Sequence, residues 1–331
     1  MCNLKKFESY DEQIKRLNAV KKIATTEHDK IYLIRYGYFT LVNGYKDIFV
    51  SNKNNRRQHT YLTNTTLEQF VHVKQFDDDL SNHLLKHLKR IEEEIRTTFM
   101  YKFDEYWLKY GLTWDVLDTK THTNVSVAMR NQITKIKDDE DFQKSKLGYV
   151  KHYRTEYDEI PSWIMIKCIK FWLVENLIDS SPSPIKSALV DMYGIESTKK
   201  NRYNNRDFRI LKGSLELMRK IRNECAHNER IYDFSRKDSR IITRFHQNLP
   251  GNKYTRGRDS KLMDLFIHMK YYLPHSEYTI FIRSTYKMLI ELKSKINSEP
   301  FSRLKNKMGI HKLEDLLLLL ENPHETKYPL R

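Results

Sequence analysis

The chain contains 331 residues, which is enough for one large domain or two medium domains with a sizeable core. Lys and Arg outnumber Asp and Glu by 59 to 43, and the resulting net charge of +16 favours a polyanionic partner, nucleic acid before an anionic membrane surface. Three dispersed cysteines without a CxxC pair argue against a zinc site or a disulfide framework and for a reducing compartment. The alternative explanation of the charge is the bias of an AT-rich genome towards Lys, Asn, Ile and Tyr.

The sequence gives no indication of a membrane segment. Residues 1–13 lack the apolar region of a signal peptide, and the most apolar segment, 160–178, is interrupted by Lys167, Lys170 and Glu175. That segment predicts a buried amphipathic helix, so the protein is expected to be soluble and cytoplasmic. Helical periodicity recurs along the chain without sustained strand alternation, and this pattern predicts an all-α fold.

The first half of the chain predicts two or three short helices over 10–50 and a polar, basic connector over 51–66. Local strand pairing is compatible with the aromatic-rich segment 35–62. A long helix is predicted over 76–107, because apolar residues recur at helical spacing and acidic residues stand near its start. Its apolar stripe consists of Leu80, Leu84, Leu88, Ile91, Ile95 and Phe99.

The second half predicts further helices after the segment 160–178. Pro184 favours a helix start and Gly194 a helix stop, and a basic connector over 197–209 leads into a helix that ends near residue 227. Three more helical segments follow at 261–273, 276–297 and 300–322, the last with a run of leucines, 316–320, that is expected to face the core. We predict three domains: an N-terminal helical module with a basic connector (1–75), a central helical bundle (76–235) and a C-terminal helical extension (236–331).

The helix that ends near residue 227 carries polar residues suited to RNA chemistry. Arg219, Asn223 and His227 recur every four residues and are expected to form a stripe away from the core, with Arg222 about 100° around from Asn223. A histidine can exchange a proton with the RNA 2′-OH, an arginine can stabilise charge on the phosphorane, and an asparagine can orient either group. Arg222, Asn223 and His227 are therefore predicted to catalyse RNA transesterification without a metal or another cofactor.

The spacing of these residues poses a geometric problem. On an ideal helix Arg222 and His227 lie about 140° apart with a rise of about 7.5 Å, too far for direct partnership. Three solutions stay open: the arginine reaches around, the helix ends near His227, or two protomers share the site. Arg240 and His246 have a similar spacing without the asparagine, so spacing alone is not specific.

The segment RNECAHNERIYDF (222–234) resembles the signature of abortive-infection (Abi) proteins of the AbiD/AbiF type. It also fits the wider HEPN pattern of arginine, a polar residue, three variable residues and histidine. Three other blocks resemble the same family in chain order: YFTLVNGYKDIF (38–49), IPSWIMIKCIKFW (160–172) and NKMGIHKLE (306–314). The first block has Asp47 and Ile48 where the family usually has a proline, a departure expected to affect a turn.

The resemblance implies a HEPN-type helical bundle with N-terminal and C-terminal helical extensions, active as a homodimer whose two motifs face one cleft. It implies antiviral defence by an endoribonuclease, a hydrolase that causes dormancy or death of the infected cell. Some AbiF-like proteins are similar to ancestors of RNA-guided CRISPR RNases and are encoded beside a structured non-coding RNA, so an RNA partner is expected. Two alternatives stay open: an RNA-binding protein that holds a non-coding RNA with a silent motif, and a helical scaffold that binds proteins.

Three basic connectors, each near a tyrosine, are predicted to bind RNA through phosphates and stacked bases. Their candidate residues are Arg56, Arg57, Lys199, Lys200, Arg202, Tyr203, Arg206, Lys253, Arg256 and Arg258. His83 and His87 lie four residues apart without a third metal ligand, and we interpret them as part of a solvated helix face. The acidic runs 77–79 and 138–141 are interpreted as helix starts or solvated runs.

Overall fold

The computed structural model describes residues 7–52, 59–157, 159–195, 205–247 and 259–321, together with Leu249 and His324. Helices dominate this part of the chain and confirm the predicted all-α class. The strands in the same residues form two short antiparallel pairs, β1 (Val50–Asn52) with β2 (Thr60–Tyr61) and β3 (Ser235–Arg236) with β4 (Ser260–Lys261), and Ala24 and Thr66 form an isolated parallel bridge. The first pair lies in the segment for which the sequence had allowed local pairing.

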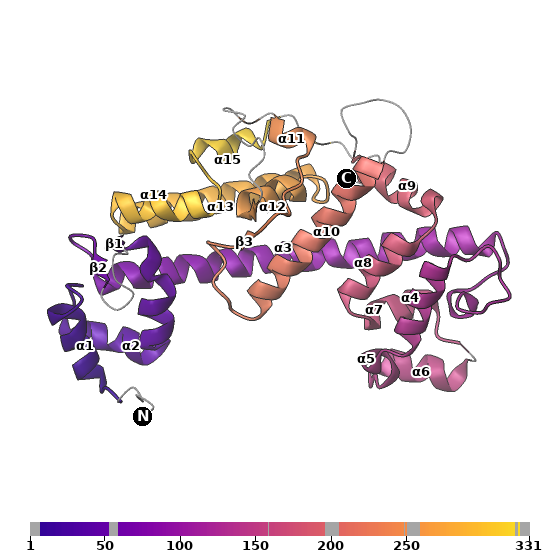
Figure 1. Ribbon diagram of the computed structural model, residues 1–331, viewed down its shortest axis with the longest axis horizontal. Coiled ribbons are helices and arrows are strands. Elements are labelled where there is room, and N and C mark those ends of the chain that lie inside the picture. The colour runs from indigo at the N-terminus through magenta and orange to yellow at the C-terminus, as the bar shows by residue number, and fades with distance from the viewer. Residues whose placement is uncertain are drawn as a thin grey trace.

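The longest element is α3 (Leu67–Leu108), whose 42 residues extend about 63 Å at 1.5 Å per residue. Figure 1 shows it running through most of the length of the molecule. The predicted start at residue 76 is wrong, because the Thr66 side chain caps the helix by accepting a hydrogen bond from the Gln69 backbone. The predicted apolar stripe is confirmed, since each of its six residues is at most 3% exposed.

Other helices pack along α3 from regions far apart in the sequence. At one end lie α1 (Tyr10–Ala19), α2 (Lys30–Tyr36) and the π-helical turn Phe39–Asn43. A C-terminal group lies along the same half of α3 (Figure 1) and comprises α11 (Arg244–Gln247), α12 (Leu262–Met269), α13 (His275–Lys295), α14 (Ser298–Lys307) and α15 (Glu314–Leu318). The other half of α3 is covered by α7 (Ser162–Cys168), α8 (Phe171–Ser180) and α9 (Ser183–Met192). Beyond them lie α4 (Val127–Lys137), which packs on α8, α5 (Glu140–Gln143), which packs on α4 and α7, and α6 (Gly148–Glu156).

The helix α10 (Asn205–Ala226) crosses α3 between these two groups and also contacts α8, α9 and α12. It agrees closely with the helix predicted to end near residue 227. Its neighbour α9 agrees as well, with Pro184 in its first turn and Gly194 in the left-handed region at φ +56° just beyond its end. Of the leucine run, Leu316 and Leu319 are buried and Leu317 is 37% exposed, so the run faces the core only in part.

The single helix predicted over 160–178 is wrong, because the chain breaks there into α7 and α8. Ile169 is extended at φ −84° and ψ 152°, which leaves carbonyl groups of α7 without helical partners. The Arg96 side chain, from α3, donates to one of them, Ile166 O, and to the carbonyl of Ile169 at the break. A contact between distant segments therefore stabilises a break that local periodicity does not reveal. No helix in the described residues is long and apolar enough to span a membrane.

Two interpretations of polar residues on α3 are also wrong. His83 stacks on Phe281 of α13 with ring centroids 4.9 Å apart, and His87 is 8% exposed, so these histidines pack between helices. Asp77 is 2% exposed and lies ten residues into α3, neither at a helix start nor in solvent. The second acidic run does contain a helix start, since the Asp139 carboxylate caps α5.

Candidate functional site

The C-terminal end of α10 is shaped by a left-handed turn. The helix ends at Ala226, His227 follows as the capping residue, and Asn228 has φ +55°. The backbone N–H of Glu229 donates to Glu224 O at 3.0 Å and that of Asn228 to Cys225 O at 3.3 Å. These two bonds form a Schellman motif, in which asparagine is a common substitute for glycine. The helix therefore ends at His227, but the backbone N–H of His227 still donates to Asn223 O at 3.0 Å, so the helix end by itself does not change the helical spacing of Arg222 and His227.

The left-handed conformation of Asn228 determines which substitutions there should destabilise the protein. Substitution Asn228→Val should lower the free energy of unfolding by about 1 kcal/mol or more, because β-branched side chains are strained at positive φ. Asn228→Gly should leave it nearly unchanged, since glycine adopts this conformation freely. Urea denaturation monitored by circular dichroism measures both. Equal losses in the two variants would show that the turn does not require a left-handed residue.

Arg222 and His227 occupy different surroundings at this helix end. His227 is exposed, whereas Arg222 reaches towards α3, where its Nε donates to Glu92 Oε2 at 2.9 Å and its Nη2 lies 2.8 Å from the same oxygen in an ion pair. Asn223, which directly follows Arg222 in the sequence, is half-buried. Glu92 also accepts from Arg96 Nη2 at 2.8 Å, so one carboxylate joins two arginines from different helices. Two arginines and one glutamate leave this cluster with a net charge of +1, suited to an anion.

The predicted polar stripe on α10 is only partly correct. Arg219 does not point freely into solvent, because its Nε donates to Glu175 Oε2 of α8 at 2.8 Å and its side chain is only 20% exposed. Burial raises the pKa of Glu175, and the charge of Arg219 opposes that rise. Arg219 therefore links α10 to α8 through an ion pair and is not part of an exposed polar stripe.

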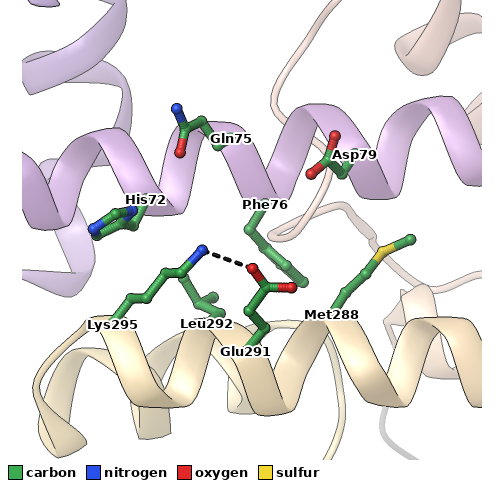
Figure 2. A pocket seen from close by; sticks show the side chains of 8 residues that line it. All are labelled: His72, Gln75, Phe76, Asp79, Met288, Glu291, Leu292 and Lys295. Atoms are coloured by element: carbon green, nitrogen blue, oxygen red, sulfur yellow. Dashed lines mark hydrogen bonds and ion pairs between the residues drawn. The ribbon is translucent and has the colours of Figure 1, made fainter.

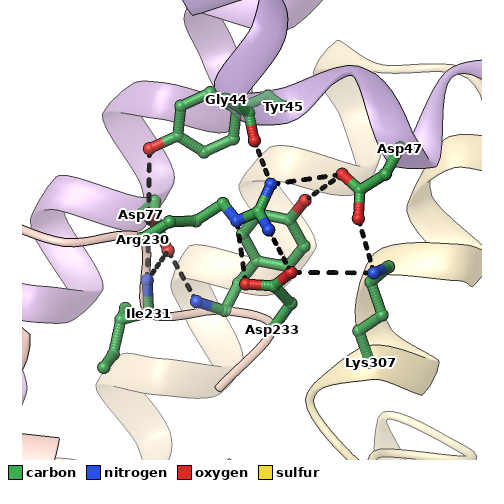
Figure 3. A network of polar contacts seen from close by, with 9 residues as sticks. Gly44, Tyr45, Asp47, Asp77, Arg230, Ile231, Asp233 and Lys307 are labelled. Carbon is green, nitrogen blue, oxygen red and sulfur yellow. Dashed lines mark hydrogen bonds and ion pairs between the residues drawn. The ribbon is translucent and has the colours of Figure 1, made fainter. Parts of the chain in front are cut away.

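The segment that follows the left-handed turn is held by a network of polar contacts, which Figure 3 shows. Arg230 donates to the carbonyl of Gly44 and pairs with Asp233 on its own segment and Asp47 on the N-terminal segment. Lys307, the last residue of α14, lies 2.5 Å from Asp47 and 3.7 Å from Asp233. Three of the blocks that carry the family resemblance, 38–49, 222–234 and 306–314, therefore meet in space.

Asp47 is the position at which the first block departs from its family pattern, and it takes part in this network. It lies in the 3₁₀ turn Lys46–Ile48 and accepts a hydrogen bond from the Tyr232 hydroxyl at 3.0 Å. Burial opposes ionisation of this carboxyl, but the nearby Lys307 and Arg230 outweigh burial and lower its pKa. The departure is at a turn, as expected, and the aspartate there contacts three residues from two other segments, Arg230 and Tyr232 from one and Lys307 from the other.

Asp77 is one of two residues at this site, with Glu92, that sequence reasoning missed. Its Oδ1 accepts from the backbone N–H groups of Tyr232 at 2.8 Å and Ile231 at 3.2 Å, and its Oδ2 accepts from the Tyr45 hydroxyl at 3.0 Å. Burial raises the pKa of Asp77 to about 6 although these hydrogen bonds oppose the rise. The one clue in the sequence is its place on the apolar face of the helix, three residues before Leu80. Asp77 fixes the chain directly after the candidate catalytic segment.

Most of the predicted RNA-binding residues lie outside the described residues. These are Arg56, Arg57, Lys199, Lys200, Arg202, Tyr203, Lys253, Arg256 and Arg258. Arg206 alone is described, and it is exposed in the first turn of α10. It lies at the opposite end of that helix from His227, so the structure does not bring it together with the candidate catalytic residues.

Other clusters of polar residues do not form a comparable site. Arg240 and His246 both contact Asp264, at 2.8 and 3.1 Å, in a cluster whose side chains are at most 9% exposed. The pocket in Figure 2, between α3 and α13, has a volume of about 70 Å³, and one of its acids, Glu291, pairs with Lys295. Within the described residues no three His, Cys, Asp or Glu side chains gather as metal ligands. The end of α10 is therefore the best candidate site.

These features define an all-α protein in which a cationic arginine cluster and an exposed histidine lie at the end of one central helix. A model of the Abi-like protein family matches residues 31–233, a region that contains this site. The chain therefore belongs to the Abi-like protein family, and this membership supports a role in phage defence by abortive infection. A comparison with curated proteins and one with solved structures gave no match.

Proposed function

We propose that this protein is an abortive-infection endoribonuclease of the HEPN type, with Arg222, Asn223 and His227 as its catalytic group. The observation that carries the proposal is the position of two side chains at one helix end: His227 is exposed at the cap of α10, and Arg222 lies partly exposed in a cluster with a net positive charge. Family membership independently supports defence as the setting.

The proposed reaction uses the RNA 2′-OH as the nucleophile. His227 takes the proton of the 2′-OH or protonates the leaving 5′ oxygen, and Arg222 stabilises the charge that develops on the phosphorane. Asn223 orients the histidine or a phosphate oxygen. No metal ion is required by this chemistry, and the products end in a 2′,3′-cyclic phosphate and a 5′-hydroxyl. Because a single helix keeps Arg222 and His227 apart, the proposed active site combines the arginine of one protomer with the histidine of its partner in a homodimer.

The experiment that tests the function is cleavage of RNA by the purified full-length protein. Labelled RNA should yield 2′,3′-cyclic phosphate ends in the presence of a chelator, and a strand with deoxyribose at the cleaved position should stay intact. Mixing Arg222→Ala protein with His227→Ala protein should restore part of the activity, because a mixed dimer regains one complete pair. A strict requirement for Mg²⁺ or cleavage of DNA would refute the mechanism, and an active monomer would refute the shared site.

A second candidate is an RNA-binding protein whose motif is silent, and the net charge of +16 is the observation that favours it. Binding of a structured non-coding RNA that co-purifies with the protein, without cleavage of any RNA, would support this function. A chain that neither binds nor cleaves RNA would leave the third class, a protein-binding scaffold.

RNA affinity should fall steeply with salt, since each neutralised phosphate releases condensed counterions. Replacing Lys199, Lys200, Arg202 and Arg206 together with alanine should reduce the slope of log affinity against log salt by up to roughly 3, at about 0.7–0.9 per lost contact. Fluorescence anisotropy over a salt series measures the slope. A control with the same loss of charge replaces four exposed lysines of the α4–α6 region, Lys135, Lys144, Lys146 and Lys151. An identical slope in the two variants would refute a role of the connector.

A further inference from the structure

Glu92 contacts only one of the two donor edges of the Arg222 guanidinium group. A guanidinium group is planar and presents two edges with paired donors, one formed by Nε and Nη2 and the other by the two Nη nitrogens. Both contacts with Glu92 Oε2 use the first edge, at 2.9 and 2.8 Å. The outer edge, with Nη1, makes no hydrogen bond to any described residue, and the side chain is 26% exposed. An anion can therefore bind that edge without displacing Glu92.

Glu92 is itself fixed from the opposite side. Its Oε1 accepts from Arg96 Nη2, and Arg96 Nη1 donates to Ile166 O and Ile169 O at the break between α7 and α8. The Arg96 guanidinium also lies 5.3 Å from the centroid of the Phe171 ring. A chain of contacts thus leads from the fourth resemblance block, 160–172, through Arg96 and Glu92 to Arg222.

A second ion pair on α10 shows what an ordinary link between helices looks like. Arg219 donates from Nε to one oxygen of Glu175, and the other oxygen of that carboxylate, Oε1, is buried without a hydrogen bond. Glu175 therefore contacts one arginine, whereas Glu92 uses both oxygens and is held by two. The exposed fractions of the two glutamates are similar, at 13% and 18%. Glu175 is thus a matched comparison for Glu92.

We propose that Glu92 is a positioning residue for the RNase reaction proposed above. It holds Arg222 by the inner edge of the guanidinium and directs the outer edge to the phosphate that is attacked. The inference rests on the proposed function, and it adds the partner that orients the catalytic arginine. Without Glu92 the long side chain of Arg222 rotates freely, and the cost falls on the rate of the chemical step more than on RNA binding.

The first test measures cleavage kinetics and rescue by free guanidinium. Glu92→Gln should lower kcat by about tenfold to a hundredfold with little change in KM, because misplacement by about 1 Å has an effect of that order. Arg222→Ala should regain part of its activity when guanidinium chloride is added at millimolar, non-denaturing concentration, since Glu92 can bind the free ion. The double variant with Glu92→Gln should not be rescued, whereas the double variant with Glu175→Gln should be. Equal rescue of both double variants would overturn the proposal.

The second test does not depend on catalysis. In protein labelled with ¹⁵N-arginine, the Nε–H resonance of Arg222, identified by its loss in Arg222→Ala, should exchange slowly with water and should exchange quickly in Glu92→Gln. Inorganic phosphate should shift the Nη resonances of Arg222 and leave Nε unchanged. If the protein cleaves no RNA but these resonances behave as expected, the proposed function fails and the positioning of Arg222 stands. An Nε–H resonance that is unchanged in Glu92→Gln refutes the positioning.

Discussion

Replacing His227 with alanine should lower the rate of RNA cleavage by about 10²–10⁴-fold, the usual contribution of a general acid or base. RNA binding should stay nearly unchanged, because one exposed imidazole adds little to the attraction that the many Lys and Arg side chains exert on phosphates. The fold should also be retained, since the described contacts of His227 are made by its backbone. The measurement compares single-turnover cleavage with binding of an RNA that carries deoxyribose at the cleaved position.

His28 provides a control for this substitution. It is an exposed histidine in the 3₁₀ turn Glu27–Asp29, and His28→Ala should cleave RNA at the rate of the unmodified protein. The catalytic role of His227 would be refuted by cleavage at the normal rate in His227→Ala. Loss of binding together with cleavage would instead assign His227 to RNA recognition.

The second large effect is expected from Asp77→Ala, which should lower the free energy of unfolding by about 3–5 kcal/mol. The substitution removes the acceptor of two buried backbone N–H groups and of the Tyr45 hydroxyl, and each unsatisfied buried group costs about 1–3 kcal/mol. Asp77→Asn should retain most of the stability, because its amide oxygen accepts from the backbone of Ile231 and Tyr232 and its amide N–H donates to the tyrosine oxygen. Urea denaturation of the two variants gives the comparison.

The sign of the pKa shift of Asp77 predicts how the stability difference between the unmodified protein and Asp77→Asn changes with pH. Burial raises the pKa of Asp77 to about 6, above the value of about 3.9 in an unfolded chain. The folded protein thus holds a proton that the unfolded chain releases, so this contribution is full below about pH 4 and is lost as pH rises through 6. Asp77→Asn does not titrate, so its stability relative to the unmodified protein should increase between pH 4 and 6. A difference that does not change with pH would show that Asp77 stays ionised.

The helices whose start, end and apolar face are encoded locally could be predicted from the sequence. Pro184 and Gly194 bound α9, and the apolar stripe of α3 is buried as expected. The break between α7 and α8 could not be predicted, because its carbonyl groups are satisfied by Arg96, more than 60 residues earlier in the chain. His83 failed as a prediction for the same reason, since its partner Phe281 is 198 residues away.

The candidate site follows the same division. The pattern of arginine, asparagine and histidine located the end of α10, and Asn228 directly after His227 is a residue tolerant of the left-handed conformation that ends the helix there. Glu92 was not identifiable, because it is one of three consecutive glutamates on α3 and only the packing of α10 selects it. Asp77 was masked in the same way by two neighbouring aspartates. Most residues of a charged run on a helix lie on its solvated face, but the helical period can place one of them on the buried face. The run itself does not show which residue that is.

The length of α3 has a consequence for synthesis on the ribosome. Its apolar face is translated early, yet it is covered by α13, whose Phe281 contacts His83 across 198 residues of sequence. At about 5–20 residues per second the ribosome needs roughly 10–40 s to make that intervening stretch. The network around Arg230 closes later still, because Lys307 belongs to α14. A nascent chain that carries the full Arg222–His227 motif thus lacks part of its folded support, and the enzyme proposed here acquires its activity only after α14 has been made.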